Sequence, residues 1–473
     1  MRPLHLATRL AVAAAFAIAA TPGLAQTGID LTQPRNAPPR GALLRLDQVP
    51  RYQVPALAIE QLMLEDQWWM GLGMPARYAA PHEVAMTPQN AGVWESLGDQ
   101  RRLWRLRVSS PGARSLNLGF LRFHLPPGAA FYLFSIGSDD ELGPFTWRDV
   151  DEHGQLWTPP LVGDEMLLAL AVPAAREHEV ALELRFINHG YAGFGAPAPK
   201  SGGCNVDLAC AAGDGWRQQG RAVGLISVAG SYYCTAFLVN NTARDRRPLL
   251  LTARHCGVHA GNAASVVVLW DHQLEGCRRD DPQADSNGRV IAQVGGLRRF
   301  QTGAHWLADD PVTDFALLEL DDPIDPALGL YFAGWDRSER APRASVVIHH
   351  PNTDAKRISI DRDPAAISSH LGSDAPGNGS HLRIGSWEVG TTEGGSSGAP
   401  LFNQDGRVVG LLHGGLAACG NHQPDWFGRL GAAWNGGGTP STRLRDWLDP
   451  LGLGVQSLDG LSARAQRPPR AKP

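Results

Sequence analysis

Short apolar runs separated by turn residues fill two long parts of the chain. In the first part, residues 104–186, Gly, Pro and Asp separate such runs. Runs this short at this spacing are typical of antiparallel strands. The pattern therefore predicts a β-rich, sandwich-like domain, and the clearest of its runs are 116–125, 129–136, 166–172 and 180–187.

The second part, from residue 204 onward, repeats the pattern with closely spaced runs and Gly-rich turns. Such spacing favours antiparallel β-barrels over alternating strands and helices. The whole chain is therefore expected to be all-β, with helices only near 57–72 and 441–448. The runs are 222–229, 234–240, 249–253, 265–270, 315–320, 344–350 and 408–415.

A Gly-, Ala- and Pro-rich stretch, 193–203, lies between the two parts and is the clearest linker in the chain. A second loosely ordered stretch is expected at 26–40. These boundaries predict three segments after residue 25. They are an N-terminal region at 26–200, which includes the stretch at 26–40, a domain at 201–460, and a tail at 461–473.

The first 25 residues have the pattern of a secretory signal peptide. Arg2 and Arg9 flank the start, an apolar run follows from Leu10 to Ala20, and small residues precede the expected cleavage after Ala25. The alternative is a membrane anchor, but the run is shorter than the roughly 20 residues needed to span a bilayer. We expect a secreted protein with no membrane segment, monomeric when mature.

Composition excludes several functions. The net charge of −4 and pI near 6.5 give no basic excess for binding nucleic acid. Three acidic pairs stand beside Pro, and we interpret them as solvated turns rather than as a paired-carboxylate site. They are Asp280-Asp281, Asp309-Asp310 and Asp321-Asp322.

All six cysteines lie after residue 200, which predicts three disulfides confined to the second part of an exported chain. Six cysteines allow 15 pairings. Their spacing does not match paired zinc-ligand motifs, and no cofactor or metal is expected. The residues are Cys204, Cys210, Cys234, Cys256, Cys277 and Cys419.

Three local patterns supply the groups needed to attack an amide: a nucleophile, a base and a carboxylate that orients the base. His255 ends the apolar run LLLTARHC, where a Cys234–Cys256 bridge would pin its loop. Asp314 heads the run DFALLEL. Each alone is typical of a structural histidine or a turn aspartate.

The run EGGSSGAPLF is the most specific of the three patterns. Glycines around Ser397 allow a sharp bend, after which the Gly395 and Ser397 N–H groups can point at one oxyanion. A flexible Gly/Ser turn is the alternative, but the following residues return directly to a strand-like pattern.

The order His, Asp, Ser resembles that of the chymotrypsin-like serine proteases. The motifs CNVDLAC, TARHCG, GWDR, IHHPN, GSSGAP, LHGG and RLRDWLDP narrow this to a resemblance to the bacterial lysyl endopeptidases, over nearly all of 201–460. The resemblance implies a chymotrypsin-like double β-barrel, a removable pro-region at 26–200 that acts as intramolecular chaperone and inhibitor, and protein and peptide substrates. It also implies the bridges Cys204–Cys419, Cys210–Cys277 and Cys234–Cys256.

By this resemblance His255 is the general base, Asp314 orients it, and Ser397 is the nucleophile that forms an acyl-enzyme. Asp425 in DWFGR matches the carboxylate that binds a substrate lysine. His413, Gly414 and Gly415 would border the substrate, and Trp387 would be either a subsite wall or a buried core residue.

The chain departs from the family pattern at two positions. Ala417 replaces a serine near the pocket, and His370 takes the place of the aromatic residue that stacks on the equivalent of His413. The first change removes a hydroxyl that could bind a lysine ammonium or steady the triad carboxylate, and the second is expected to remove ring stacking. Both changes bear on lysine preference and rate.

Lysine is rare, with Lys200, Lys356 and Lys472 the only ones among 43 basic residues. A lysine-specific protease would spare most of its own chain, although a GC-rich genome would also favour arginine. Lys200 lies in the linker, so processing between Lys200 and Ser201 is expected. Ser396 precedes the nucleophile where trypsin-type zymogens carry Asp, which excludes activation through that aspartate.

Three other functions compete with this interpretation. One is a serine endopeptidase with Arg/Lys or broader specificity, and another is a catalytically silent binding protein on the same fold. The third, a metallohydrolase built on His255 and His259, lacks the glutamate of the usual helical motif.

Overall fold

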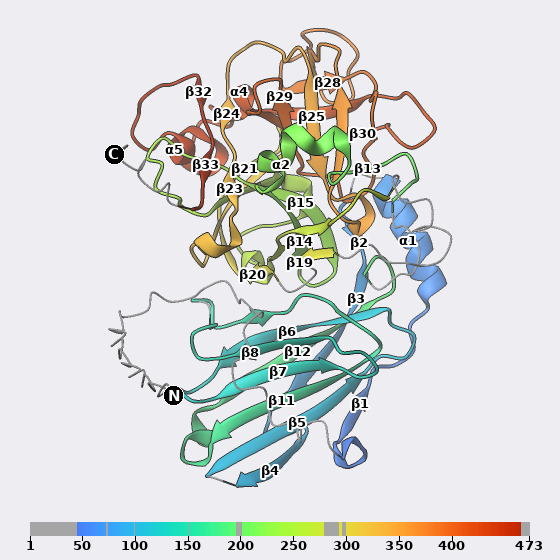
Figure 1. Cartoon of the computed structure of the whole chain (residues 1–473), viewed down its shortest axis with the longest axis vertical. Coiled ribbons are helices and arrows are strands. Elements are labelled where there is room, and N and C mark those ends of the chain that lie inside the picture. The colour runs from blue at the N-terminus through green and yellow to red at the C-terminus, as the bar shows by residue number, and fades with distance from the viewer. Residues whose placement is uncertain are drawn as a thin grey trace, which may run out of the picture.

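The computed structural model describes residues 45–71, 74–98, 100–150, 152–194, 201–278, 293–295 and 299–464. The expected signal peptide, the stretch at 26–40, Lys200 and Lys472 lie outside these residues. Strands dominate both parts of the chain, as expected (Figure 1). No helix among the described residues is long and apolar enough to cross a membrane.

The N-terminal domain is a sandwich of two sheets. The order of the first sheet is β1-β5-β11-β7-β8, with β4 on β5, and that of the second is β10-β6-β12-β3, with β9 on β6. The strands are Arg51–Gln53 (β1), Ala79–Met86 (β3), Val93–Gly98 (β4), Arg101–Ser109 (β5), Ser115–His124 (β6), Ala130–Ser135 (β7), Glu141–Phe145 (β8), Leu156–Trp157 (β9), Leu161–Val162 (β10), Glu165–Pro173 (β11) and Ala181–Gly190 (β12).

Alternating apolar residues on these strands fill the space between the two sheets with a core rich in Phe and Leu. The sandwich is therefore confirmed. It begins earlier than the apolar runs indicated, because β1, β3 and β4 carry many polar residues on their exposed faces.

The first barrel of the second part follows the strand order β20-β17-β14-β15-β16-β22-β21. Its two end strands are joined by Gly303 alone, so the sheet curls back on itself. The strands are Val223–Val228 (β14), Tyr232–Leu238 (β15), Leu249–Ala253 (β16), Val267–Leu269 (β17), Phe300–Thr302 (β20), Ala304–Asp310 (β21) and Phe315–Leu320 (β22).

The second barrel follows the order β13-β26-β25-β29-β30-β31-β28-β27, with β24 and β32 at its side. The strands are Val206–Asp207 (β13), Trp335–Asp336 (β24), Ser345–His349 (β25), Arg357–Asp361 (β26), Ala366–Ser368 (β27), His381–Ile384 (β28), Pro400–Asn403 (β29), Val408–Gly415 (β30), Asp425–Arg429 (β31) and Ser457–Leu458 (β32). Two antiparallel barrels in sequence are the expected chymotrypsin-like architecture.

Helices are few and short. The one at Ile59–Gly71 (α1) was expected, whereas that at Arg445–Leu448 (α5) is shorter than predicted because Pro440–Thr442 forms a separate 3₁₀ turn. The others are Arg217–Gly220 (α2) and Leu430–Ala433 (α4), and two small ribbons pair His272–Leu274 (β18) with Gln293–Gly295 (β19) and Tyr331–Phe332 (β23) with Leu461–Ser462 (β33).

The last of these ribbons places residues 461–464 in the fold rather than in a tail. Ala463 is buried, and its N–H donates to Leu330 O. The ordered domain thus extends past residue 460, and only 465–473 lie outside the description.

The sandwich packs against the outer face of the first barrel (Figure 1). Strand β2 (Ala76–Arg77) adds itself to β15 beside Tyr232 and Tyr233. Tyr78 is fully buried there and its hydroxyl bonds Ser227 Oγ at 2.9 Å. The two domains therefore share one apolar core and one extended sheet.

The acidic pairs are less solvated than predicted. Asp310 is buried and accepts hydrogen bonds from the Thr313 N–H and hydroxyl at 2.9 and 2.6 Å. The Asp321 side chain is only 3% exposed and faces His153 of the sandwich. Asp280-Asp281 lies outside the described residues.

Candidate active site

The histidine loop is held at the end of β16. The chain turns through a 3₁₀ helix at Arg254–Cys256, which ends at Gly257 in the left-handed conformation (φ 79°). Cys256 is bonded to Cys234 on β15, so the half-buried His255 sits on a loop fixed at both ends.

His255 and Asp314 form a preassembled pair. The imidazole Nδ1 donates to Asp314 Oδ2 at 2.6 Å, and the His255 backbone N–H donates to Oδ1 at 3.0 Å. Asp314 is 3% exposed, and its φ of 58° turns the chain immediately before β22. With its Nδ1 hydrogen directed to the carboxylate, the imidazole has Nε2 available as a base.

Ser397 lies in a tight turn just before β29, where two glycines have no room for a side chain. A Cβ at Gly395 (φ 88°) would stand 2.1 Å from the Tyr233 ring, and one at Gly398 (φ 82°) 2.4 Å from Thr235 O. Glycine is thus required at both positions for conformation and for space.

Thr235 anchors this turn from the first barrel. Its hydroxyl donates to Gly395 O at 2.9 Å, and its N–H donates to Ser397 O at 2.9 Å. Among the described residues, the N–H groups of Gly395 and Ser397 donate to no other group. Two free donors on an immobilised turn are what an oxyanion hole requires.

The third link of the triad is open in this structure. In the described part of the chain, the His255 side chain bonds Asp314 and makes no hydrogen bond to the Ser397 hydroxyl. Such bonds are often long without substrate and tighten when it binds. The structure thus joins His255 to Asp314 on the first barrel, and Thr235 of the same barrel holds the turn that carries Ser397.

Asp425 at the start of β31 is 1% exposed, and its two oxygens differ. Oδ2 accepts from Trp387 Nε1 and from Thr392 Oγ1, both at 2.7 Å. Oδ1 has no hydrogen-bond partner among the described side chains. Burial raises the pKa of this carboxyl, while Trp387, Thr392 and the backbone N–H of Ala417 oppose the rise.

Gly415 leaves room for the second oxygen of Asp425. A Cβ at Gly415 would stand 2.0 Å from Oδ1, whereas a Cβ at Gly414 would meet nothing within 4 Å. Both glycines lie at the end of β30. Oδ1 is itself buried, and a buried carboxylate oxygen without a hydrogen bond is stabilised by a cation that binds to it.

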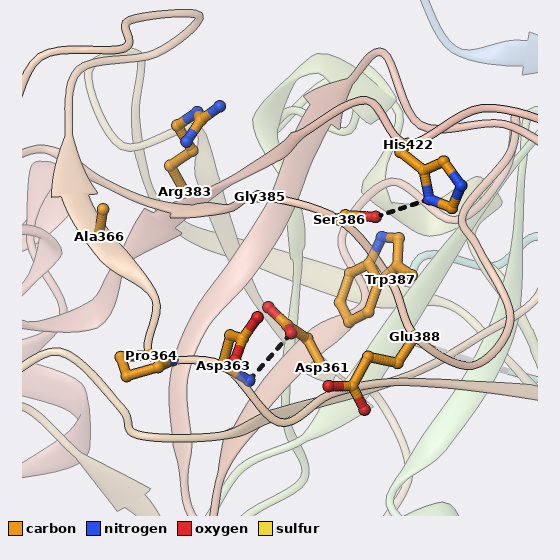
Figure 2. Close-up of a pocket in the computed structure, with 10 residues that line it drawn as sticks. All are labelled: Asp361, Asp363, Pro364, Ala366, Arg383, Gly385, Ser386, Trp387, Glu388 and His422. Atoms are coloured by element: carbon orange, nitrogen blue, oxygen red, sulfur yellow. Dashed lines mark hydrogen bonds between the residues drawn. The ribbon is translucent and has the colours of Figure 1, made fainter.

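The sequence left Trp387 as either a subsite wall or a buried core residue, and the structure buries it. It is 8% exposed, packs edge-on against Phe427, and positions the Asp425 carboxylate. It also lines a surface pocket with Asp361, Glu388 and His422 (Figure 2). None of the triad residues lines that pocket.

Four histidines cluster around Asp314. The ring of His413 stacks on that of His370 with centroids 3.6 Å apart and lies 5.7 Å from that of His255. His413 Nδ1 bonds His381 Nε2 at 3.0 Å, and its Nε2 lies 3.6 Å from Asp314 Oδ2. The expected loss of ring stacking is therefore wrong, because the flat imidazole of His370 stacks on His413 as an aromatic ring would. His381 is a member of the cluster that the sequence did not reveal.

Burial keeps these imidazoles neutral. It lowers the pKa of His413 to about 4, although Asp314 opposes the shift, and lowers that of His381 to about 3. The His370 pKa falls for the same reason. The Asp314 charge is therefore available to the protonated form of His255.

Ser396 and Glu393 brace the nucleophile turn from behind. Ser396 Oγ bonds His349 Nδ1 at 2.7 Å, and Glu393 accepts from Asn352 Nδ2 at 2.7 Å and from Gly202 N at 3.0 Å. The Ser396 side chain is thus committed to the interior of the second barrel. Thr235 and Thr392 carry no local sequence signal, and the motif IHHPN contains His349 without indicating its partner.

Ser201, the expected first residue after processing, is buried beside Asp354. Its hydroxyl donates to Asp354 Oδ2 at 2.7 Å, and its N–H approaches the same oxygen at 3.4 Å. Arg357 and Arg278 also bind Asp354. The described domain therefore begins in a charged, buried network.

The remaining residues singled out in the sequence are also placed. The structure contains all three implied disulfides, Cys204–Cys419, Cys210–Cys277 and Cys234–Cys256. Ala417 packs against the core of the second barrel. His259 accepts from Gly261 N and joins no described group of potential metal ligands.

Known families match both halves of the chain. A family model described as the lysyl endopeptidase C-terminal domain matches residues 198–428, and one described as the lysyl endopeptidase N-terminal domain matches 69–190. A lysyl endopeptidase of Pseudomonas aeruginosa is 28% identical over 385 residues, which cover 75% of this chain and 78% of that protein.

Solved structures resemble about half of the chain. A mutant of human heparin binding protein is 16% identical with a TM-score of 0.34, covering 50% of this chain and 95% of its own. The active form of the Rv3671c protease from M. tuberculosis is 17% identical with a TM-score of 0.30, and the match covers 49% of this chain and 83% of that chain.

Proposed function

The chain belongs to the lysyl endopeptidase family of chymotrypsin-fold serine proteases, and from this premise we propose that it hydrolyses peptide bonds on the carboxyl side of lysine. The observation that carries the proposal is the buried Asp425 carboxylate, whose Oδ1 lies against Gly415 without a hydrogen bond among the described residues. A protein or peptide substrate would place its lysine ammonium on this oxygen.

The geometry of Asp425 favours lysine over arginine. A guanidinium binds a carboxylate best with two parallel hydrogen bonds, one to each oxygen, whereas an ammonium is a compact charge that one oxygen can hold. Oδ2 already accepts from Trp387 and Thr392. With one oxygen occupied, the site suits the single-point contact of lysine.

The proposed reaction uses the triad in two half-reactions. His255 Nε2 takes the Ser397 hydroxyl proton as Oγ attacks the carbonyl carbon, and the oxyanion accepts from the Gly395 and Ser397 N–H groups. The C–N bond then breaks, and His255 protonates the leaving amine. Water, activated by the same imidazole, hydrolyses the acyl-enzyme and restores Ser397.

Asp314 acts in both half-reactions by holding His255. Its two oxygens fix the ring and the backbone of the histidine, and its charge stabilises the imidazolium that forms. The neutral stack of His413 and His370 shields this carboxylate from water without competing for its charge.

The proposal extends to maturation. Residues 1–25 would direct export, and cleavage after Lys200 would release the N-terminal region 26–200. Lys356, the lysine within the described residues, is 1% exposed and donates to Gly220 O, which protects the mature domain from its own activity.

A cleavage assay with matched peptides tests the proposal. Peptides that differ only in Lys, Arg or norleucine before the scissile bond should show kcat/KM highest for Lys. Equal rates for Lys and Arg would favour the broader serine endopeptidase, and no cleavage by a folded, processed chain would favour a silent binding protein.

A further inference from the structure

A second group of ionisable residues lies between the sandwich and the first barrel. Glu152 and His153 come from the loop between β8 and β9, His305 lies on β21, and Asp321 follows β22. Asp321 and Asp314 lie at opposite ends of β22, about 20 Å apart at roughly 3.3 Å per strand residue. The group is thus separate from the triad.

The side chains of this group converge on one point. His153 Nε2 lies 3.3 Å and His305 Nε2 3.5 Å from the same atom, Asp321 Oδ1. The two rings are 4.6 Å apart, and Glu152 Oε1 contacts His305 Nε2. Ligand atoms of His153, His305 and Asp321 all lie within 4.8 Å of one another.

These separations fit the edges of a metal coordination shell. Hydrogen bonds between imidazolium and carboxylate are about 2.7–2.9 Å, shorter than the two distances to Asp321. Around a tetrahedral Zn²⁺ with bonds of about 2.0–2.1 Å, ligand atoms stand roughly 3.3 Å apart. The observed 3.3 and 3.5 Å match this spacing.

Charge and hydrogen count lead to the same conclusion. His305 Nε2 carries at most one hydrogen, yet two carboxylates, Glu152 and Asp321, face it. The two rings are tilted by 44° to one another with centroids 4.6 Å apart, so one ion can reach both. A divalent cation at Asp321 would bind the two imidazoles in the neutral form that metal ligands need.

We propose that His153, His305 and Asp321 form a Zn²⁺ site, with Glu152 beside it, that bridges the N-terminal domain and the first barrel. Two imidazoles and a carboxylate are a donor set that zinc accepts. Because the N-terminal domain supplies His153 and the barrel supplies His305 and Asp321, the ion binds only when the domains are docked. Zinc therefore strengthens the hold of the N-terminal domain on the protease domain.

The experiment uses the full chain with Ser397→Ala, so that proteolysis cannot separate the domains and the result does not depend on the proposed activity. The chain is stripped with a chelator and dialysed against Zn²⁺, and bound metal is counted. One zinc per chain is expected, with affinity at least tenfold lower in His153→Ala and in His305→Ala. His124→Ala, an exposed histidine of the same sandwich, is the matched control and should bind normally.

Thermal unfolding provides the second measurement. Zinc should raise the Tm of the Ser397→Ala chain and of the His124→Ala control, but not that of either ligand variant, while all four chains unfold alike without metal. His153 and His305 are partly exposed, so both variants should fold. No stoichiometric zinc, or zinc retained in both ligand variants, would overturn the site.

Discussion

Replacing Asp425 by Asn tests the specificity pocket without changing its shape. The amide oxygen can keep the bonds from Trp387 and Thr392, while an NH₂ group takes the place of Oδ1. A lysine ammonium would then meet a donor where it needs an acceptor. The loss is therefore one of charge and hydrogen bonding, not of packing.

The magnitude follows from burial. Removing one partner of a buried, hydrogen-bonded charge pair costs about 2–5 kcal/mol. At about 1.4 kcal/mol per factor of ten, kcat/KM for lysine peptides should fall roughly 30-fold to several thousand-fold. Asp425 is 1% exposed and its Oδ1 accepts no hydrogen bond from the described residues, which places the expected loss near the upper end.

The same substitution should not destabilise the free enzyme. Burial raises the pKa of Asp425, so the folded domain pays for ionising this carboxyl at every pH above its folded pKa. Asn carries no such cost. The Tm of Asp425→Asn at neutral pH should equal or exceed that of the wild type, which also serves as evidence that the variant folds.

The assay compares kcat/KM for Lys, Arg and norleucine peptides in both enzymes. Asp425→Asn should lose lysine cleavage while keeping norleucine cleavage, because a neutral side chain needs no carboxylate. If lysine cleavage persists, or if norleucine cleavage falls equally, the assignment of Asp425 as the lysine-binding group is wrong.

Three further changes test the support of the site. Thr235→Val removes the hydroxyl that holds Gly395 O, and steady-state kinetics should show kcat about tenfold lower with KM nearly unchanged. A tenfold rise in KM with kcat unchanged would contradict a role of this turn in binding the oxyanion. Replacing Cys234 and Cys256 by Ser removes a bridge between residues 22 positions apart, and should lower the free energy of unfolding, measured in urea, by about 3 kcal/mol. An unchanged urea midpoint would show that the bridge does not stabilise the fold. His413 has a pKa of about 4 in the folded chain against 6.5 in the unfolded chain, so the unfolded chain binds more protons between these values and stability is lost as pH falls from 6.5 to 4. In His413→Gln the Tm should fall less steeply over this pH range. A Tm that falls with pH as steeply as in the wild type would refute the neutral stack.

Residues that act through their immediate neighbours could be predicted from the sequence. His255, Asp314 and Ser397 each stand at a strand end in a distinctive local pattern. The structure bonds His255 to Asp314 on the first barrel, and Thr235 of that barrel holds the turn of Ser397. The glycines of the nucleophile turn were equally evident, because a bend of that kind demands glycine on local grounds.

Residues that act through distant contacts could not be found in the same way. Thr235 meets Gly395 across 160 positions, and His349 meets Ser396 across 47. Thr392 has no distinctive neighbours in the sequence, and only the fold places Asp425 of β31 beside its hydroxyl. A lone Ser, Thr or His carries no signal of a partner that only the tertiary fold supplies.

The surroundings of two segments were misjudged for the same reason. Asp321 beside Pro fits a solvated turn, yet docking of the sandwich covers it with His153. Residues 461–464 look like part of a polar tail, yet β33 pairs with β23. In both cases the segment contacts a distant part of the chain, which the local sequence pattern does not show.

The most direct test is a complete map of the bonds cut in one unfolded protein that contains many lysines and arginines, by the wild type and by Ser397→Ala. The account predicts cuts after lysine alone, a mature N-terminus at Ser201 in the wild type, and neither cuts nor processing in the variant. Cleavage by Ser397→Ala would contradict the serine mechanism, and cuts after arginine at equal frequency would contradict lysine recognition by Asp425.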